Sequence, residues 1–372
     1  MKILIISNMY PSKENPSYGI FVKNFVNELK KYFKIDLIVI KKREKNKFKK
    51  LLKYLIFYLK IIFKLLFNNY DLVYIHYPSH VSIPVYFISK IKRMKIILNF
   101  HGDDALKKNG ILNNLFYNFL KKLVRKANLI VVPSKYFRNI VINNFNISLN
   151  KIYIYPSGGI DFTIFKPLNK GKCKEKFGFS SNDVVLGYVS SIMEEKGWKI
   201  FLDIVKKISE IKPNVKAIVA GYGKDEIRFL KYIKKHKLEN DIKFLGKCSQ
   251  NFLPYVYNAM DIFIFPTLLN ESLGLVGLEA MACKVPVVAS KLGGIRDYVI
   301  DGYNGFLCKP NNVDDFFKKV NILIDNSKIL KTLSNNAYET AKKFDKNIVN
   351  EKLVKKLYEV ISDENFRYSR WS

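Results

Sequence analysis

The chain has 372 residues, 48% of them apolar, which excludes a disordered protein and, at roughly 100 to 200 residues per domain, predicts two domains. Its 64 basic and 32 acidic residues give a net charge of +32, which must attract something anionic: nucleic acid, acidic lipid or a phosphorylated substrate. The four cysteines contain no CxxC pair, so neither a disulfide framework nor a zinc site is predicted, and a reducing cytosol fits best.

Short apolar runs alternate with helical patterns through the first half. Strand-like runs cover residues 2–7, 36–40, 71–75, 95–100 and 128–132, and helices are expected near 18–33 and 49–68. Because these runs are rich in Val and Ile and separated by helices, they predict a parallel sheet covered on both faces, a Rossmann-like unit. Met1 leads directly into the first run without a basic n-region or cleavage site, so we expect a cytoplasmic protein.

A second series of strand-like runs follows the turn-rich stretch 156–178. These runs cover residues 184–190, 216–223, 242–246, 261–266 and 285–290. Two doubly wound domains joined by a linker leave a central cleft at the carboxyl ends of their strands, where ligands bind. We therefore expect an α/β protein with domains at 1–165 and 166–345, closed by one or two helices in 346–372.

The segment NESLGLVGLEAMACKVPVVAS, residues 270–290, lies between two predicted strands. Glu271 precedes a glycine-containing turn, Gly274 opens a helix, and Glu279 lies within that helix. A helix start presents free backbone N–H groups and a positive dipole end, which suit a diphosphate. Glu279 could accept hydrogen bonds from a ribose, and Glu271 from hydroxyls of a transferred sugar. The alternative is an ordinary helix with a solvated glutamate.

A lysine follows the first strand of the second half. The loop reads GYVSSIMEEKGW and places Lys196 and Gly197 just before a helix. Lys196 would face the same cleft as the helix that Gly274 opens, and could neutralise the charge that builds on a departing diphosphate. The alternative is a solvated lysine, one of many in this chain.

The second half, from about Gly187 to Pro310, resembles family 4 of the retaining glycosyltransferases, which have the two-domain GT-B fold. ESLGLVGLEAMACKVPVVAS is similar to the E-x7-E signature of that family and the strand after it. LGGIRDYVIDGYNGFLCKP resembles its continuation, and AGYG with FLGKCSQNFLPYVYNAMDIFIFPT resembles its middle section. YPSGGIDFTIFKP, residues 155–167, resembles the interdomain linker, where a hinge would let the domains close over a reactive donor.

The resemblance implies transfer of a sugar, with retention, from a UDP- or GDP-linked donor to a glycan or lipid-linked acceptor in surface polysaccharide biosynthesis. It implies donor contacts by Lys196, Glu271 and Glu279, with Lys196 and Glu271 also catalytic. Backbone groups near three further residues would also bind the donor: Leu273, Gly274 and Leu275. No cofactor and no metal are expected, since the family generally works without a metal.

One pair of residues departs from the family pattern. The family commonly has Gly-Arg before the lysine, with the arginine also touching the diphosphate, whereas this chain has Ser190 and Ser191. Lys196 would then carry more of the charge stabilisation, with the serine hydroxyls assisting as donor-binding groups.

Two positions of the first half are candidates for the same reaction. Gly19 lies just ahead of a helix, where its backbone could approach a donor phosphate or the acceptor; a simple turn is the alternative. His101 follows the run 95–100 in the sequence HGDD, at the carboxyl end of a strand. The family often has His-Gly there, and the resemblance implies a catalytic role near the reacting sugar; a structural histidine is the alternative.

Two further pairs of polar residues are candidate sites. Asp103 and Asp104 are adjacent rather than spaced as a D-x-D metal pair, so they either aid acceptor binding or cap the next helix. His76 and His80 are four apart, a metal-ligand spacing on a helix, but DLVYIHYPSH is typical of a strand and loop. We expect no metal there.

Residues 41–64 hold ten basic residues and one acidic residue, Glu44. On a helix, Lys49, Lys53, Lys60 and Lys64 form one narrow stripe. The other side holds apolar residues: Leu51, Tyr54, Leu55, Tyr58, Ile62, Leu65 and Leu66. The interrupting lysines disfavour a transmembrane span. We expect a helix packed on the sheet, a helix docked peripherally on the anionic inner face of the cell membrane, or both.

Three other functions fit parts of the sequence. A nucleotide-sugar epimerase would use the same fold without an acceptor, and a non-catalytic sugar-binding relative would fit Ser191. A nucleic-acid-binding protein would explain the charge, but the chain has no helix-turn-helix, zinc-finger or aromatic RNP pattern, so no specific nucleic-acid partner is expected. Codon usage biased toward Lys, Asn and Ile would explain the basic excess without any partner.

Overall fold

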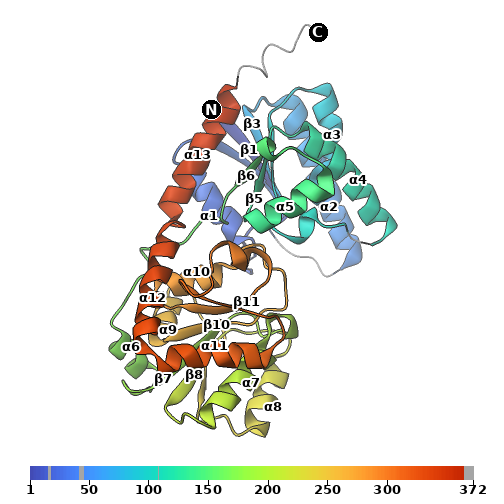
Figure 1. Ribbon diagram of the computed structural model, residues 1–372. Helices are drawn as coiled ribbons and strands as arrows, with labels where there is room; N and C mark the ends of the chain where they lie inside the picture. The colour runs from blue at the N-terminus through green and yellow to red at the C-terminus, as the bar shows by residue number, and fades with distance from the viewer. Residues whose placement is uncertain (16–17, 42–45, 108, 364–372) are drawn as a thin grey trace. The chain divides into compact units, whose positions relative to one another are not determined.

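The chain forms two compact units, seen in a computed structural model that describes residues 1–15, 18–41, 46–107 and 109–363 (Figure 1). The first unit comprises Met1–Gly158 together with the chain from Val349 onward. The second comprises Gly159–Ile348. The break after Gly158 falls within the segment 155–167, and the end of the chain belongs to the first unit.

A six-stranded parallel sheet forms the centre of the first unit, in the order β2-β1-β3-β4-β5-β6. Its strands are β1 (Lys2–Ser7), β2 (Lys34–Val39), β3 (Leu72–His76), β4 (Ile96–Asn99), β5 (Leu129–Val132) and β6 (Ile152–Ile154). Successive side chains of a strand point to opposite faces. In β1, Leu4 and Ile6 therefore enter one core while Ile3 and Ile5 enter another, so the sheet is buried on both faces.

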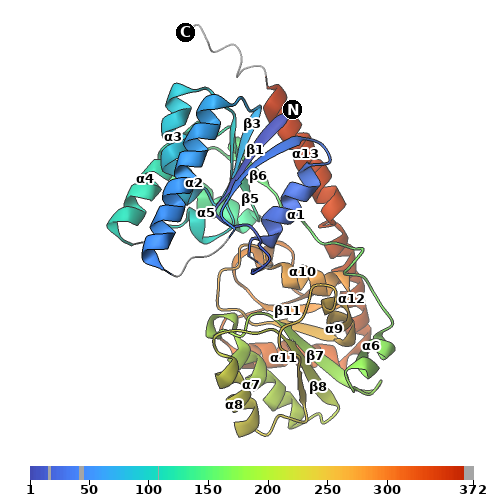
Figure 2. The ribbon, with the colours of Figure 1, turned by 180° about the vertical axis from the view of Figure 1, so that it is seen from behind.

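Helices cover both faces of this sheet (Figures 1 and 2). One face carries α2 (Lys47–Phe67), α3 (Ser82–Ile91), α4 (Ile111–Lys126) and α5 (Lys135–Phe145). The other carries α1 (Ile20–Leu29) and α13 (Lys346–Ser362). From Val349 on, α13 is held there by the fully buried Leu353 and Leu357, and by a hydrogen bond of 2.6 Å from the Tyr155 hydroxyl to Asn350 Oδ1. The C-terminal segment thus forms one described helix.

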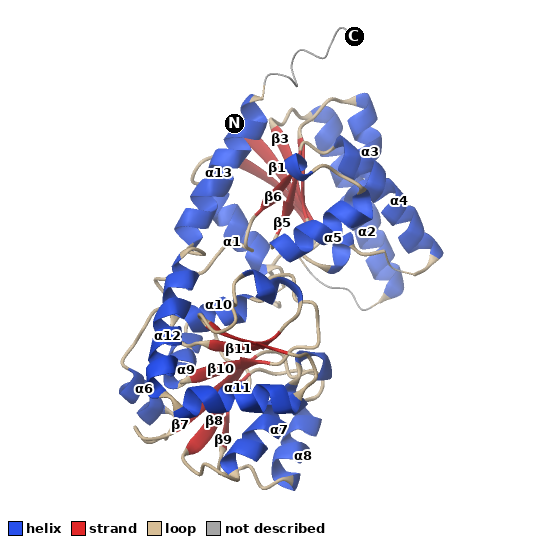
Figure 3. Cartoon of the chain, viewed as in Figure 1, coloured by secondary structure: helices blue, strands red, loops and turns tan. Residues whose placement is uncertain are grey.

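The second unit repeats this plan with a parallel sheet in the order β12-β11-β10-β7-β8-β9 (Figure 3). Its strands are β7 (Val184–Val189), β8 (Val215–Ala220), β9 (Ile242–Phe244), β10 (Ile262–Phe265), β11 (Val287–Ser290) and β12 (Gly305–Cys308). One face carries α7 (Trp198–Ser209), α8 (Glu226–Lys235) and α11 (Val313–Asp325). The other carries α6 (Lys170–Lys176), α9 (Leu253–Ala259), α10 (Leu275–Ala282) and α12 (Ser327–Lys342). The predicted pair of doubly wound α/β sheets is confirmed.

Three short elements were not expected from the sequence. The edge strands β6 and β12 have three and four residues, and an edge strand with one neighbour needs no long apolar run. The helix α6 lies within the stretch expected to be turns, and begins because Asn169 Oδ1 accepts a hydrogen bond of 3.0 Å from Lys172 N. Among all the described helices, none has the length and apolar content needed to span a bilayer.

Candidate active site

The helix α10 begins at Gly274 without a capping side chain. Gly274 has φ 84°, a left-handed conformation that favours glycine, and its carbonyl accepts a hydrogen bond of 2.8 Å from the Tyr298 hydroxyl. The N-cap residue therefore supplies no side-chain acceptor to the first-turn N–H groups, which lie at the positive end of the helix dipole. Leu273 is buried and Leu275 half-buried, so their backbones are the parts suited to a ligand.

Lys196 and Glu271 form an ion pair in the second unit. Lys196 Nζ lies 2.6 Å from Glu271 Oε1, which also accepts a hydrogen bond of 3.0 Å from the Thr267 hydroxyl. The two partners come from loops after β7 and β10, which are neighbouring strands. Because the carboxyl ends of parallel strands meet at one edge, the loops place these side chains together.

Close backbone contacts fix the Lys196 loop. Lys196 ends the short 3₁₀ turn Glu194–Lys196, and Gly197 follows with φ 78°. A Cβ on Gly197 would lie 1.9 Å from the Pro266 carbonyl oxygen, so only glycine fits. The carbonyl of Glu195 accepts a hydrogen bond of 2.9 Å from Leu268 N. The loops after β7 and β10 are thereby joined through their backbones as well as through the ion pair.

Two glycines support the Glu271 loop. A Cβ on Gly293, where φ is 53°, would lie 2.4 Å from the Glu271 carbonyl oxygen, and one on Gly294 would lie 2.4 Å from that of Ser272. Gly294 N also donates a hydrogen bond of 2.7 Å to the Glu271 carbonyl. The backbone that carries Glu271 therefore rests directly on the backbone of this segment.

We expect Gly293→Ala to lower the free energy of unfolding by about 2–3 kcal/mol, because strain at a positive φ costs ~1–3 kcal/mol and the new Cβ must displace the Glu271 loop. Chemical denaturation measures the loss. Gly302→Ala is the matched control, since Gly302 has φ 74° but nothing within 4 Å of the added Cβ. Equal losses in the two variants would show that the contact with Glu271 is unimportant.

Glu279 is buried in α10 and only 7% exposed. Its Oε2 accepts a hydrogen bond of 2.8 Å from the Tyr257 hydroxyl, and its Oε1 one of 3.2 Å from Gln250 Nε2. Burial raises the pKa of Glu279 to about 7, although both hydrogen bonds act to lower it. Each carboxylate oxygen has about two acceptor positions, so one on each oxygen is left for a ligand.

The two serines lie at the end of β7. Ser190 is half-buried and its backbone N donates a hydrogen bond of 3.2 Å to the Ala220 carbonyl. Ser191 is exposed, and its carbonyl accepts a hydrogen bond of 3.4 Å from the buried Tyr188 hydroxyl, which also donates to the Lys196 carbonyl at 3.2 Å. Tyr188 thus ties the serine pair to the loop of Lys196.

His101 pairs with His76 in the first unit. Nε2 of His101 lies 2.9 Å from Nδ1 of His76, and the rings are 5.1 Å apart and nearly parallel. The Tyr77 ring also stacks on the His101 ring, with 4.7 Å between the ring centres. Burial lowers the pKa of His101 to about 3, and burial followed by the neighbouring His101 lowers the pKa of His76. Both rings are therefore neutral, one donating a hydrogen bond and the other accepting it.

We expect neither imidazole to titrate between about pH 5 and pH 8, the range in which an unperturbed histidine changes charge. A nitrogen NMR titration of the whole protein measures this, with His76→Gln and His101→Gln to assign the signals. A signal of either residue with a midpoint near 6.5, the ordinary value for histidine, would contradict the neutral pair.

Two other residues of the first unit shape its loops. Asp104 is buried, and its Oδ1 accepts hydrogen bonds from the backbone N of His101 at 3.0 Å and of Gly102 at 2.8 Å, so Asp104 holds the His101 turn. The side chain of Asp103 lies outside the described residues. Gly19 is the N-cap of α1 with φ 71°, and a Cβ there would lie 2.7 Å from the Met9 carbonyl carbon. This close approach alone requires a glycine.

The candidate residues form two groups. Lys196, Glu271 and the uncapped start of α10 belong to the second unit with Glu279, whereas Gly19 and His101 belong to the first. His76 ends β3 and His80 lies in the 3₁₀ turn Pro78–Val81, so the two do not share a helix, as predicted. The described part of the chain contains no cluster of three or more His, Cys, Asp or Glu suited to a metal.

Several contacts of these residues were missed from the sequence. Thr267, Tyr257 and Gln250 hydrogen-bond to the two glutamates, and His76 pairs with His101. Two of these residues could have been found from their place in the chain. Thr267 and His76 each lie at the carboxyl end of a strand, and the neighbouring strand leads to Lys196 or His101.

Two family models match the chain. The model described as Glycosyltransferase Family 4 matches residues 6–160, and the model described as Glycosyl transferases group 1 matches residues 169–340. The chain belongs to the family 4 glycosyltransferases. This glycosyltransferase is 29% identical to an uncharacterized glycosyltransferase of Methanocaldococcus jannaschii, over 98% of this chain and 99% of the relative.

Two further similarities support the family and the fold. The glycosyltransferase is 29% identical to the capsular polysaccharide biosynthesis glycosyltransferase CapM of Staphylococcus aureus, over 60% of each chain. The crystal structure of HepE from Anabaena in complex with UDP and glucose matches with a TM-score of 0.73 at 22% identity, over 96% of this chain and 100% of that chain. The GT-B fold and the assignment as an enzyme are thereby confirmed.

Proposed function

We propose that this glycosyltransferase transfers a sugar, with retention, from a UDP- or GDP-linked donor to a glycan or lipid-linked acceptor in surface polysaccharide biosynthesis. It would act in the cytoplasm, bound peripherally to the anionic inner face of the cell membrane. The proposal depends above all on the ion pair of Lys196 and Glu271, 2.6 Å apart. This pair joins the loop after β7 to the loop that leads to the uncapped start of α10.

In this proposal Lys196 exchanges one anionic partner for another. Without a donor, Glu271 neutralises the ammonium group. A diphosphate carries more negative charge than one carboxylate, so it competes for Lys196 and frees Glu271 to accept hydrogen bonds from hydroxyls of the donor sugar. The first-turn N–H groups of α10 then bind the same diphosphate. The hydroxyls of Ser190 and Ser191 supply donors where the family commonly has arginine.

Glu279 would bind the ribose. Its free acceptor positions match two vicinal hydroxyls, and the hydrogen bond from the Tyr257 hydroxyl fixes the orientation of the carboxylate. Gln250 is exposed, so a nucleotide can reach the carboxylate by displacing this one side chain. Tyr257 is buried and keeps its hydrogen bond.

The first unit would bind the acceptor. We propose that the domain 1–165 binds the acceptor, with Gly19 and His101 contacting it, and that the domain 166–345 binds the donor. Because burial keeps the pKa of His101 at about 3, its imidazole serves as a neutral hydrogen-bond partner of a sugar hydroxyl rather than as an acid. No protein nucleophile is required in a front-face reaction with retention.

A panel of nucleotide sugars tests the function. A true donor is expected to raise the melting temperature, since ligand at 100 times its Kd stabilises by about 2.7 kcal/mol. Incubation with that donor and a glycan or lipid-linked acceptor should then release nucleotide diphosphate and give a product with the anomeric configuration of the donor. Conversion of the donor into an epimer without any acceptor, or an inverted product, would contradict the proposal.

A further inference from the structure

The helices over one face of the first sheet lack acidic residues. α2 carries six basic residues, α3 one, α4 four and α5 two, and none of the four contains an Asp or Glu. Each of the other described α-helices except the short α9 contains at least one acidic residue. A codon bias would deplete acidic residues along the whole chain, so depletion confined to one face points to an anionic partner for that face.

The same face exposes large apolar side chains. Phe57, Ile61 and Leu65 bury one side of α2, but Phe48 and Phe63 are 74% and 61% exposed. They belong to a wide exposed set on α2: Phe48, Leu51, Leu52, Leu55, Ile56, Leu59, Phe63, Leu66 and Phe67. A helix that only packed on the sheet would carry polar residues there. Packing on the sheet therefore explains only part of the α2 sequence.

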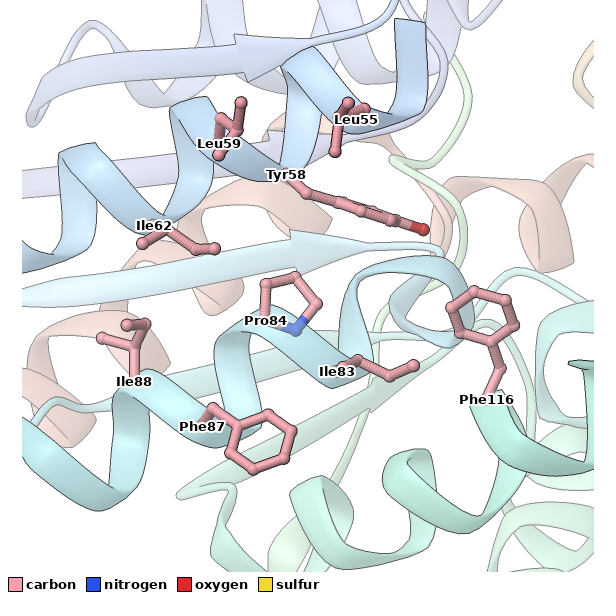
Figure 4. Close-up of a pocket in the computed structure, with 9 residues that line it drawn as sticks. All are labelled: Leu55, Tyr58, Leu59, Ile62, Ile83, Pro84, Phe87, Ile88 and Phe116. Atoms are coloured by element: carbon pink, nitrogen blue, oxygen red, sulfur yellow. The ribbon is translucent and has the colours of Figure 1, made fainter. Parts of the chain in front are cut away.

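An apolar groove of about 340 Å³ lies between α2 and α3 (Figure 4). Its lining contains no charged residue: Leu55, Tyr58, Leu59, Ile62, Ile83, Pro84, Phe87, Ile88 and Phe116. The single hydroxyl among them, that of Tyr58, donates a hydrogen bond of 2.8 Å to the His80 carbonyl. The groove thus offers an apolar surface with its one polar group already bonded.

Two lysines lie on aromatic rings that neighbour Phe87 of this groove. Lys90 Nζ lies 5.2 Å from the centre of the Tyr86 ring, and Lys122 Nζ lies 5.1 Å from that of Phe119. The Phe119 ring packs at 5.4 Å against Phe87, which lines the groove. Lysine side chains that lie along aromatic rings place an ammonium group at the edge of an apolar surface. This arrangement is complementary to an anionic lipid, with its head group over the lysines and its hydrocarbon chain below.

We propose that the face formed by α2, α3 and α4 docks on an anionic lipid bilayer, and that the groove between α2 and α3 takes up a hydrocarbon chain of one of its lipids. The inference deepens the membrane association proposed above and rests on it. A nucleic acid would match the charge but leave the exposed apolar set unburied, whereas an amphipathic helix in the bilayer interface buries that set and keeps its lysines at the head groups.

Vesicle binding of the whole protein tests the docking face. Wild type should co-sediment with phosphatidylcholine vesicles that contain phosphatidylglycerol and not with pure phosphatidylcholine vesicles. Substituting Lys47, Lys49 and Lys60 by Gln should weaken binding about 100-fold, or ~3 kcal/mol. The control variant removes the same charge by replacing three exposed lysines of α8, which are Lys231, Lys234 and Lys235. If both triple variants bound the vesicles equally weakly, this face would not be the docking surface.

A tryptophan in the groove tests the lipid chain. Phe87→Trp should show fluorescence quenched by vesicles with brominated acyl chains, beyond the quenching of the two native tryptophans in wild type. The control is Tyr32→Trp, because Tyr32 is also about half exposed but follows α1 on the opposite face of the sheet.

These two assays distinguish three claims: uptake of a lipid chain by the groove, association with the membrane, and transfer of a sugar. If Phe87→Trp bound vesicles without added quenching, the groove would not take up a lipid chain, but the membrane association would remain supported. No binding to acidic vesicles would overturn both. Neither assay needs a nucleotide sugar, so a failure of sugar transfer would contradict the proposed reaction without affecting these results.

Discussion

Lys196→Ala is expected to lower kcat about 100- to 1,000-fold, the usual effect of removing one group that stabilises developing charge in a transition state. In the proposed reaction the leaving diphosphate gains charge as the bond to the sugar breaks. The Gly197 turn fixes the backbone of Lys196, and Glu271 pairs with its ammonium group until the donor binds. Steady-state kinetics with a donor from the thermal-shift panel measures the loss.

Two variants make the Lys196 result specific. Lys196→Arg keeps the positive charge and should retain more activity than Lys196→Ala, since a guanidinium also binds phosphate oxygens. Lys224→Ala removes an exposed lysine from the neighbouring loop after β8, where Lys224 pairs with Glu195, and should leave kcat within about threefold. If Lys196→Ala and Lys224→Ala had similar rates, Lys196 would be a surface lysine without a role in transfer.

Glu279→Gln is expected to weaken donor binding roughly 10- to 100-fold, because hydrogen bonds to a charged group contribute about 1.5–3 kcal/mol. The variant keeps the size of the side chain, so the packing of α10 is preserved. Since the pKa of Glu279 is about 7, donor affinity of wild type should also fall as the pH drops below 7 and the carboxylate gains a proton. Isothermal titration with UDP at several pH values measures both effects.

The stability of the wild-type protein should depend on pH through Glu279, whereas that of Glu279→Gln should not. The folded pKa of Glu279 lies above the ordinary carboxyl value of 4.5, so the folded state binds its proton more tightly than the unfolded state. Its contribution is complete below about pH 4.5 and is lost as the pH rises to about 7, a change of about 3 kcal/mol. Glu279→Gln should lack this loss.

Glu339→Gln is the control, because Glu339 is an exposed glutamate paired with Lys342 on the surface of α12. It should change neither UDP affinity nor the pH dependence of unfolding. An unchanged affinity in Glu279→Gln would leave the carboxylate with a structural role only.

The fold and the local order of the segment from Glu271 to Glu279 could be predicted from the sequence. Each strand that is buried on both faces is a continuous apolar run, such as 2–7, so the alternation of strand and helix is visible without tertiary information. Glu271, Gly274 and Glu279 lie within nine consecutive residues, and a glycine marks where the helix begins. Local sequence therefore determined how these three residues are arranged.

Contacts between distant segments could not be predicted in the same way. Lys196 and Glu271 are 75 residues apart, and they meet only because β7 and β10 are neighbours in the sheet. His76 was compared with His80, four residues away, but its partner is His101 because β3 lies next to β4. Strand order decides both pairs, and the positions of apolar residues do not reveal strand order.

Which apolar residues of α2 are exposed could not be predicted from the sequence either. Helical periodicity separated the lysine stripe from the apolar residues, but it could not tell which apolar residues would pack on the sheet. Leu65 is buried whereas Leu51 and Leu55, assigned to the same side, are mostly exposed. Only the position of the sheet relative to α2 divides this wide apolar surface into a packed and a solvent-facing part.

The central claim is that the start of α10, Lys196 and the two glutamates bind a nucleotide sugar. A crystal structure of the protein with UDP or GDP tests it most directly. We expect the diphosphate within hydrogen-bonding distance of Lys196 Nζ and of the Leu275 backbone N–H, with ribose hydroxyls on Glu279. A nucleotide bound elsewhere, with Lys196 still paired to Glu271 and Glu279 bonded only to Tyr257 and Gln250, would contradict it.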